Sequence, residues 1–138
     1  MRLLLLFVAL LLAACGATKF VAQVQTIVLT EQDKDKPLTV SVGDSFVIRL
    51  NENPTTGYVW AIDVQTELLV LQRSDYVSDA QPNTHGAVHI VGGGGKRSFT
   101  FVAPKSGVAT LKLKHWRSWE GDASIVDTFS ILVQIEAK

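Results

Sequence analysis

The sequence predicts an all-β fold, and within that class an antiparallel β-sandwich of seven or eight strands. The first observation is that apolar and polar residues alternate with a period of two in most segments, which is the pattern of strands with one buried face. The second is that no window keeps the 3.6-residue period of an amphipathic helix. Strands with one apolar face each are expected to pair into two sheets that pack face to face.

The strands can be placed in chain order from this alternation. We expect a first strand over residues 20–29 and a charged loop over residues 31–37. A short apolar run at residues 68–71 has no face that the pattern assigns. The alternating segments that we interpret as the remaining strands are residues 38–42, 46–50, 58–64, 99–103, 109–115 and 129–135.

One tryptophan narrows the fold class further. Trp60 lies on the third of these alternating segments, where we expect it to face the core together with Tyr58, Ile62 and Val64. Immunoglobulin-like sandwiches often bury a tryptophan on such a strand. The chain has a single cysteine, Cys15, so it lacks the disulfide of antibody domains. The sequence therefore predicts an immunoglobulin-like sandwich without that disulfide.

The N-terminus has the pattern of an export signal. Met1 and Arg2 precede an unbroken apolar run at residues 3–12, which is too short to span a bilayer. The residues up to Cys15 resemble the cleavage box of bacterial lipoproteins, so we expect Cys15 to become a lipidated first residue. Gly16 rather than Asp follows, which favours the outer membrane facing the periplasm. The alternative is ordinary cleavage that leaves Cys15 as a free thiol.

Composition and length indicate one globular domain. Hydrophobic residues make up 47% of the chain and charged residues 19%, which excludes a disordered protein. The formal net charge is zero, so no basic surface is expected to attract nucleic acid. We divide the chain into a lipoprotein signal peptide (residues 1–14), an anchor or linker with the first strand (residues 15–36) and a single monomeric domain (residues 37–138).

The first of three unusual loops has the residues of a stiff turn. It spans residues 53–58 between two alternating segments. Pro54 fixes its own φ, and Gly57 permits a positive φ where the chain turns back. Thr55 and Thr56 are β-branched and lose little rotamer freedom on ordering. The sequence therefore predicts a rigid tip suited to a narrow cleft, and the alternative is an ordinary hairpin connection.

The other two loops lie later in the chain. Residues 77–95 are long for a connection in a compact domain and end in four glycines. Residues 116–122 place Trp116, Arg117 and Trp119 between two strands, and exposed Trp and Arg together are typical of binding hot spots. The alternative for Trp116 is that it closes the end of the sandwich. Since alternate connections of a sandwich emerge at the same end, we expect the three loops to lie together.

In the same order, the three loops resemble the motifs of the chagasin-type inhibitors of papain-like cysteine peptidases. The family patterns are N-P-T-T-G-[YF], G-x-G-G and R-P-W, and the resemblance covers residues 38–135. Ser118 departs from it, because the family usually has Pro at that position. The matching segments are Asn53-Pro54-Thr55-Thr56-Gly57-Tyr58, Gly92-Gly93-Gly94-Gly95 and Arg117-Ser118-Trp119-Glu120-Gly121.

This resemblance implies a reversible, non-covalent inhibitor whose three loops form a wedge across the peptidase active site. Thr55 and Thr56 would lie nearest the catalytic cysteine, and the glycines would let the backbone approach the enzyme closely. Arg117 and Trp119 would pack on the far side of the cleft. The peptidase-binding residues that the resemblance implies are Asn53, Pro54, Thr55, Thr56, Gly57, Gly92, Gly93, Gly94, Gly95, Arg117, Trp119 and Glu120.

The sequence contains no motif that supports an enzymatic function. The four glycines do not form a phosphate-binding loop, because Ile90 stands where its first Gly would be and a strand follows. His85 and His89 are four residues apart, but Gly86 and the lack of helical periodicity argue against a shared metal site. His115 is interpreted as a strand-end residue. We therefore expect no catalytic residue, no cofactor and no metal.

Two further functions could use the same loops. One is an immunoglobulin-like adhesion or assembly module of the cell envelope. The other is a carbohydrate-binding domain in which Trp116 and Trp119 are stacking platforms. The tip formed by Thr55 and Thr56 favours the inhibitor, because neither of these alternatives requires that motif.

Overall fold

A computed structural model describes residues 26–79 and 93–138 of the chain. Residues 1–25 and 80–92 lie outside the described residues. The predicted signal peptide, Cys15, Gly92, His85 and His89 therefore fall in segments of which the structure gives no account.

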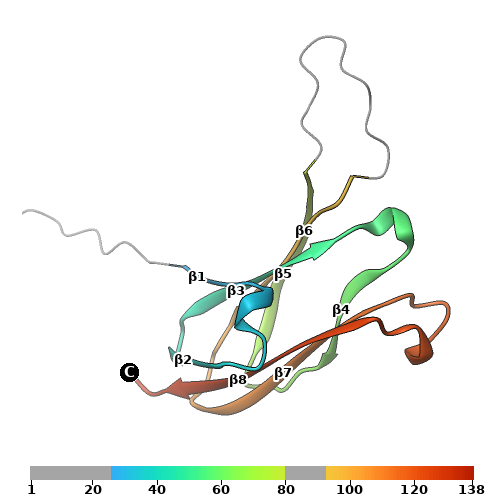
Figure 1. The fold of residues 1–138 in the computed structure, drawn as a ribbon. Helices are drawn as coiled ribbons and strands as arrows, with labels where there is room; N and C mark the ends of the chain where they lie inside the picture. The colour runs from blue at the N-terminus through green and yellow to red at the C-terminus, as the bar shows by residue number, and fades with distance from the viewer. Residues whose placement is uncertain (1–25, 80–92) are drawn as a thin grey trace, which may run out of the picture.

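The described residues form two four-stranded sheets packed face to face, as Figure 1 shows. Sheet A has the order β1-β3-β6-β5, and sheet B has the order β2-β8-β7-β4. The predicted all-β sandwich is confirmed. The elements are β1 Ile27–Leu29, η1 Glu31–Asp33, β2 Pro37–Ser41, β3 Ser45–Glu52, η2 Pro54–Thr56, β4 Val59–Val64, β5 Val70–Ser78, β6 Gly95–Val102, β7 Gly107–Trp116, η3 Asp122–Ser124 and β8 Asp127–Glu136, where η is a 3-10 helix.

The central strand pairs are antiparallel, but an outer pair in each sheet is parallel. β1 runs parallel to β3, and β2 runs parallel to β8. The chain alternates between the sheets at its start, from β1 in sheet A to β2 in sheet B and back to β3. Two reversals in succession return the chain to its first direction, which makes β1 and β3 parallel. Residue alternation is the same in both kinds of pair, so the sequence did not reveal this detail.

The core lies between the sheets at the positions that the alternation indicated. On β3 the wholly buried side chains Phe46, Ile48 and Leu50 face one side of the strand. The ring of Phe46 stacks on that of Phe101 from β6, with 5.7 Å between centroids. The buried hydrophobic residues are Val40, Phe46, Ile48, Leu50, Trp60, Leu69, Phe99, Phe101, Ala103, Ala109, Leu111, Leu113, Phe129, Ile131, Val133 and Ile135.

The alternation fails at the end of β4. Trp60 is buried as predicted, but Val64 is 41% exposed rather than facing the core. The pairing of β4 with β7 shifts register between Ile62 and Val64. An irregularity of this kind turns the following side chain to the other face of the sheet, and the sequence pattern carries no sign of it.

The sandwich begins earlier than the predicted domain boundary at residue 37. β1 pairs with β3 within sheet A. The carboxylate of Glu31 in η1 accepts a hydrogen bond from the backbone N–H of Asn51 on β3. The segment before residue 37 therefore contributes a strand and a 3-10 helix to the domain. Of the predicted first strand over residues 20–29, the structure describes residues 27–29 as a strand. Among the described residues, no helix has the length and apolar character needed to cross a membrane.

The described ends of the three unusual connections lie at one end of the sandwich (Figure 1). We name them loop 1 (residues 53–58), loop 2 (residues 79–94) and loop 3 (residues 117–126). Loop 2 is shorter than the predicted span of residues 77–95, because Ser78 and Gly95 still pair across β5 and β6. The Asp79 N–H donates to the Gly94 carbonyl at 3.0 Å and closes the base of this loop.

Candidate functional site

Loop 1 is held by hydrogen bonds within the loop itself. The Asn53 side chain caps η2: its Oδ1 accepts from the Thr55 hydroxyl at 2.6 Å and from the Thr55 N–H at 3.3 Å. The Asn53 carbonyl accepts from the Thr56 N–H and hydroxyl at 3.1 and 2.7 Å. Gly57 ends the turn with a φ of 82°, in the left-handed region that favours glycine. These hydrogen bonds agree with the predicted stiff turn, and Thr55 and Thr56 are both exposed at its tip.

Loop 3 begins with a β-turn that is fixed from below. The Glu120 N–H donates to the Arg117 carbonyl at 3.0 Å, which closes a turn over residues 117–120. The buried Ser124 hydroxyl accepts from the Arg117 N–H at 3.0 Å and donates to the Gly121 carbonyl at 2.7 Å. Ser124 therefore ties both ends of the turn to η3.

Arg117 joins loop 3 to loop 1. Its Nε and Nη2 donate to the Thr56 carbonyl at 3.3 and 3.0 Å. Its Nη1 pairs with the Glu120 carboxylate at 3.0 Å, and its guanidinium lies 4.3 Å above the centre of the Tyr58 ring. A planar guanidinium can make all of these contacts at once, whereas an ammonium group cannot. The described contacts of Arg117 are thus with its own chain.

Trp119 is the exposed residue of loop 3 where this loop contacts loop 1. Its side chain is 69% exposed, in agreement with the predicted position at a loop tip. The edge of its indole lies against Gly57: a Cβ at Gly57 would stand 2.6 Å from the Trp119 Cη2. Glycine is therefore required in loop 1 both by its φ and by the tryptophan of loop 3.

The stem of loop 2 lies beside the end of β3. Gly95 pairs with Glu52 on one side and with Ser78 on the other. A Cβ at Gly95 would meet the Val77 carbonyl at 2.3 Å and the Tyr76 hydroxyl at 2.6 Å, so this glycine is needed for packing inside sheet A. A Cβ at Gly93, in contrast, would meet no described atom within 4 Å.

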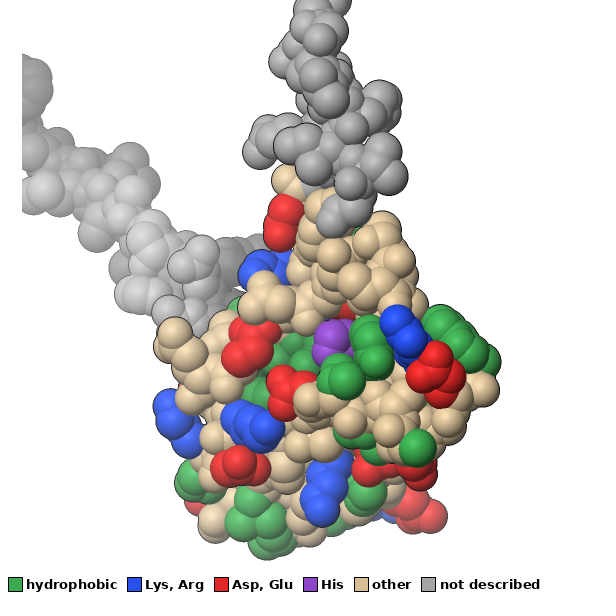
Figure 2. Space-filling view, turned by 45° about the vertical axis from the view of Figure 1, so that its right-hand side comes forward, with side chains coloured by type: hydrophobic (Ala, Val, Ile, Leu, Met, Phe, Trp, Pro, Cys, Tyr) green, Lys and Arg blue, Asp and Glu red, His purple; other side chains and the backbone are tan. Residues whose placement is uncertain are grey.

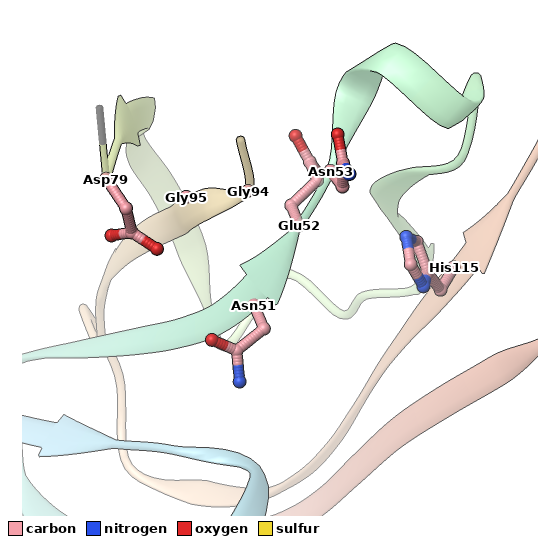
Figure 3. A pocket seen from close by; sticks show the side chains of 7 residues that line it. All are labelled: Asn51, Glu52, Asn53, Asp79, Gly94, Gly95 and His115. Carbon is pink, nitrogen blue, oxygen red and sulfur yellow. The ribbon is translucent and has the colours of Figure 1, made fainter. Parts of the chain in front are cut away.

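A hollow of about 300 Å³ opens between the stems of loops 1 and 2. In Figure 3, Glu52 and Asn53 at the end of β3 lie between the Gly94–Gly95 stem and His115 of β7. The His115 ring stacks on Trp60, with 4.8 Å between centroids, and Tyr58 meets it edge-on at 5.8 Å. The interpretation of His115 as a strand-end residue agrees with its place near the end of β7. The lining residues are Asn51, Glu52, Asn53, Asp79, Gly94, Gly95 and His115.

Trp116 is less available as a stacking platform than Trp119. The Lys114 ammonium lies 3.8 Å from the centre of the Trp116 ring and covers one face of it. A hydrogen bond to Asp122 raises the pKa of Lys114, with a second carboxylate from Asp63 at 3.2 Å. This arrangement favours the interpretation in which Trp116 closes the end of the sandwich over its use in sugar binding.

The described surface offers no metal centre and no single-charge patch on the face that Figure 2 shows. Acidic and basic side chains are interspersed there. In residues 26–79 and 93–138, no group of three His, Cys, Asp or Glu side chains is placed to hold a metal ion.

Sequence reasoning missed three residues that hold the loops. Glu52 is buried and pairs with Arg97 at 2.7 Å, and Ser124 is buried beneath loop 3. The alternation of apolar and polar residues contained a signal for Glu52 and Arg97. Glu52 continues the inward phase of Ile48 and Leu50, and Arg97 continues that of Phe99 on β6. Two opposite charges in the apolar phase of paired strands indicate a buried ion pair.

Comparison with known proteins identifies the family. Residues 39–133 match the family described as "Chagasin family peptidase inhibitor I42". Amoebiasin-1 of Entamoeba histolytica is 31% identical over 108 residues, which cover 78% of this chain and 98% of that protein. Amoebiasin-2 of the same organism is 33% identical over 93 residues, or 67% and 72% of the two chains.

A solved structure agrees with this match. The crystal structure of the cysteine protease inhibitor EhICP2 from Entamoeba histolytica has a TM-score of 0.69 at 28% identity, over 80% of this chain and 96% of that one. The prediction of an inhibitor rather than an enzyme is confirmed by the family match. With its sandwich and this family match, the chain belongs to the chagasin family of peptidase inhibitors.

Proposed function

We propose that the chain, as a monomer, inhibits papain-like cysteine peptidases by placing loops 1, 2 and 3 in the active-site cleft, reversibly and without a covalent bond. The observation that carries this proposal is the pair of hydrogen bonds from Arg117 to the Thr56 carbonyl. They fix the tip of loop 1 relative to Trp119 before any partner binds. A preorganised surface loses less entropy on binding. The related EhICP2 is described as a cysteine protease inhibitor.

The tip of loop 1 suits occupation of the cleft without cleavage. Thr55 and Thr56 are the exposed residues that would approach the catalytic cysteine. Their backbone forms the helical turn η2 rather than the extended strand in which a peptide adds to a sheet edge. The peptide bonds of this turn are therefore not presented in the extended geometry of a substrate, and attack on them is disfavoured.

The flanking loops extend the contact to either side. Trp119 and Glu120 are exposed and would meet the far side of the cleft. Arg117 contributes by bracing loops 1 and 3. Of the two described glycines of loop 2, Gly93 is the more open to close approach by the enzyme, because a side chain there would meet nothing in the described chain.

Titration of papain with the Cys15→Ser protein tests this function. Stoichiometric loss of activity is expected, and full activity at micromolar inhibitor would reject the proposal. Gly57→Ala serves as the site variant, because its Cβ would stand 2.6 Å from Trp119. Gly43→Ala is the matched control: Gly43 has a comparable φ of 85° but a Cβ there would meet only Lys138, at 3.9 Å. Inhibition should weaken in the first variant and remain in the second.

We propose in addition that Cys15 is lipidated and anchors the inhibitor to a bacterial membrane, the outer membrane facing the periplasm. The support is the apolar leader at residues 3–12 followed by the sole cysteine of the chain. Stable anchoring needs two or more acyl chains, as a lipoprotein cysteine carries. Intact mass of protein extracted from membranes should show an acylated Cys15 as the first residue. A soluble protein with an unmodified thiol would reject the anchor.

A further inference from the structure

A charged residue is buried where loop 1 leaves the sandwich. Glu52 is the last residue of β3, one position before the Asn53 cap, and its side chain has no exposed surface. Removing a carboxylate from water is unfavourable unless donors replace the lost hydration. The donors that surround Glu52 therefore show what this residue holds in place.

Three strands meet at this carboxylate. Arg97 on β6 donates from Nη2 to Oε1 at 2.7 Å and from Nε at 3.1 and 3.2 Å. The backbone N–H of Trp60 on β4 donates to Oε2 at 2.7 Å. Since β3 and β6 belong to sheet A and β4 to sheet B, the carboxylate of Glu52 links the two sheets by hydrogen bonds.

The same contacts close the stem of loop 1. Glu52 precedes the loop and Trp60 follows it, so the hydrogen bond at 2.7 Å joins its two ends. A second bond runs the same way, from the Trp60 indole N–H to the Asn51 carbonyl at 2.8 Å. The segment between them, which carries the threonine tip, is thus held at both ends.

Arg97 carries the connection on to loop 2. Its guanidinium lies 5.5 Å from the centre of the Tyr76 ring, and the two residues are paired across β5 and β6. The Tyr76 hydroxyl fills the space where a side chain at Gly95 would stand. Gly95 in turn pairs with Glu52. Figure 3 shows Glu52 close to the Gly94–Gly95 stem.

We propose that Glu52 and Arg97 are positioning residues of the inhibitor, which hold loop 1 against the Gly94–Gly95 stem, so that the threonine tip has a fixed place relative to sheet A when the peptidase binds. A buried ion pair often contributes little net stability compared with apolar residues of similar size, and in some proteins its role is to select one geometry. The pair therefore acts on affinity through loop geometry rather than through a contact with the enzyme. This proposal rests on the proposed function, and its test includes a measurement that needs no peptidase.

The variant Glu52→Leu/Arg97→Met removes both charges, so no unpaired charge is left buried. Its inhibition constant for papain should rise about tenfold or more, mostly through faster dissociation. Ile131→Val is the control: it removes a methyl group from the buried core and lowers thermal stability without touching a loop. Both are assayed at a temperature where thermal unfolding shows them fully folded. An unchanged inhibition constant in the double variant would overturn the proposal.

Amide hydrogen exchange provides the measurement without peptidase. The N–H groups of Trp60 and Gly57 should exchange at least about tenfold faster in the double variant, and that of Leu111 in the core at the wild-type rate. Arg97→Lys, which keeps the charge and loses the fork, should fold and show a smaller effect in the same direction. If the wild type fails to inhibit papain, the proposed function is wrong. The exchange rates then still show whether Glu52 and Arg97 hold loop 1 in place. Wild-type exchange at Gly57 and Trp60 in both variants would show that the pair positions nothing.

Discussion

At the scale of single residues, the polar side chains of the site bond to other residues of the same site. The hydroxyls of Thr55 and Thr56 both bond to Asn53, and the guanidinium of Arg117 is divided among Thr56, Glu120 and Tyr58. That Arg117 also touches the peptidase, as the resemblance implies, stays a prediction. What remains free for a partner is a preset surface whose exposed aromatic anchor is Trp119.

Trp119→Ala should weaken binding to papain by about 2 kcal/mol or more, the loss typical of a hot spot. The indole is 69% exposed, so thermal stability should change little. Titration calorimetry with papain and thermal unfolding of the free protein measure the two effects separately.

Trp60→Ala is the companion variant with the opposite expectation. Trp60 is 6% exposed, and its removal should cost about 3–5 kcal/mol of unfolding free energy as a cavity in the core. Because the Trp60 indole N–H also donates to the Asn51 carbonyl at the stem of loop 1, some affinity should be lost with it. Unfolding of Trp119→Ala together with an unaffected Trp60→Ala would invert the assignment of the two tryptophans.

Arg117→Lys tests the brace between loops 1 and 3. A lysine cannot donate the fork to the Thr56 carbonyl, so about 1 kcal/mol, or roughly fivefold in the inhibition constant, should be lost. Arg49→Lys is the matched control, since Arg49 donates one long bond to Ser98 on the outer side of sheet A. Equal inhibition by wild type and Arg117→Lys would mean that the brace is dispensable.

At the scale of elements, loops 1 and 3 are each built on a local turn that is held by its own hydrogen bonds. Loop 1 uses the Asn53 cap and the positive φ of Gly57. Loop 3 uses the turn closed by the Glu120 N–H and the buried Ser124 below it. The geometry of these two tips is therefore largely local, while the distance between them depends on side chains that cross from one loop to the other.

Ser118→Pro should tighten inhibition about two- to fivefold. Ser118 is the second residue of the turn over residues 117–120, where proline is favoured. Within the described chain the Ser118 N–H makes no hydrogen bond. The φ of Ser118 is not positive, because among the described residues other than glycine a positive φ occurs at Asp35. Proline would thus restrict the free loop without removing a contact, an effect worth about 0.4–1 kcal/mol.

Surface plasmon resonance with wild type and Ser118→Pro checks this expectation. The gain should reside mostly in a slower dissociation rate. A faster dissociation rate in the variant would show that loop 3 of this chain departs from the family geometry. The implied roles of Arg117 and Trp119 would then lose their support, whereas those of Thr55 and Thr56 would not.

At the scale of the whole molecule, anchoring and inhibition should be separable. The described strands begin with β1, and Cys15 precedes β1 in the sequence. Cys15→Ser should therefore leave the inhibition constant for papain unchanged, while the protein moves from the membrane to the soluble fraction of expressing cells. Retention in the membrane fraction would contradict a lipid anchor, and a loss of inhibition would contradict the separation.

The alternation of apolar and polar residues was sufficient to predict the sandwich, because successive side chains of a strand point to opposite faces of the sheet and the apolar face is buried. Each strand with one apolar face has a single way to hide that face, so Phe46, Ile48 and Leu50 could be placed inside without a structure. The stiffness of loop 1 was equally local, since Pro54 and Gly57 act on their own backbone. These features depend on residues that are close together in the chain.

The sequence alone determined the fold class, the core faces and the family motifs, since all of these lie in local order. Only the tertiary structure decided the parallel outer pairs and the use of Arg117 as a brace rather than a free side chain. Each of these joins residues that are far apart in the chain. These features depend on strand direction and on which side chains meet across two loops, and the spacing of apolar residues indicates neither of them.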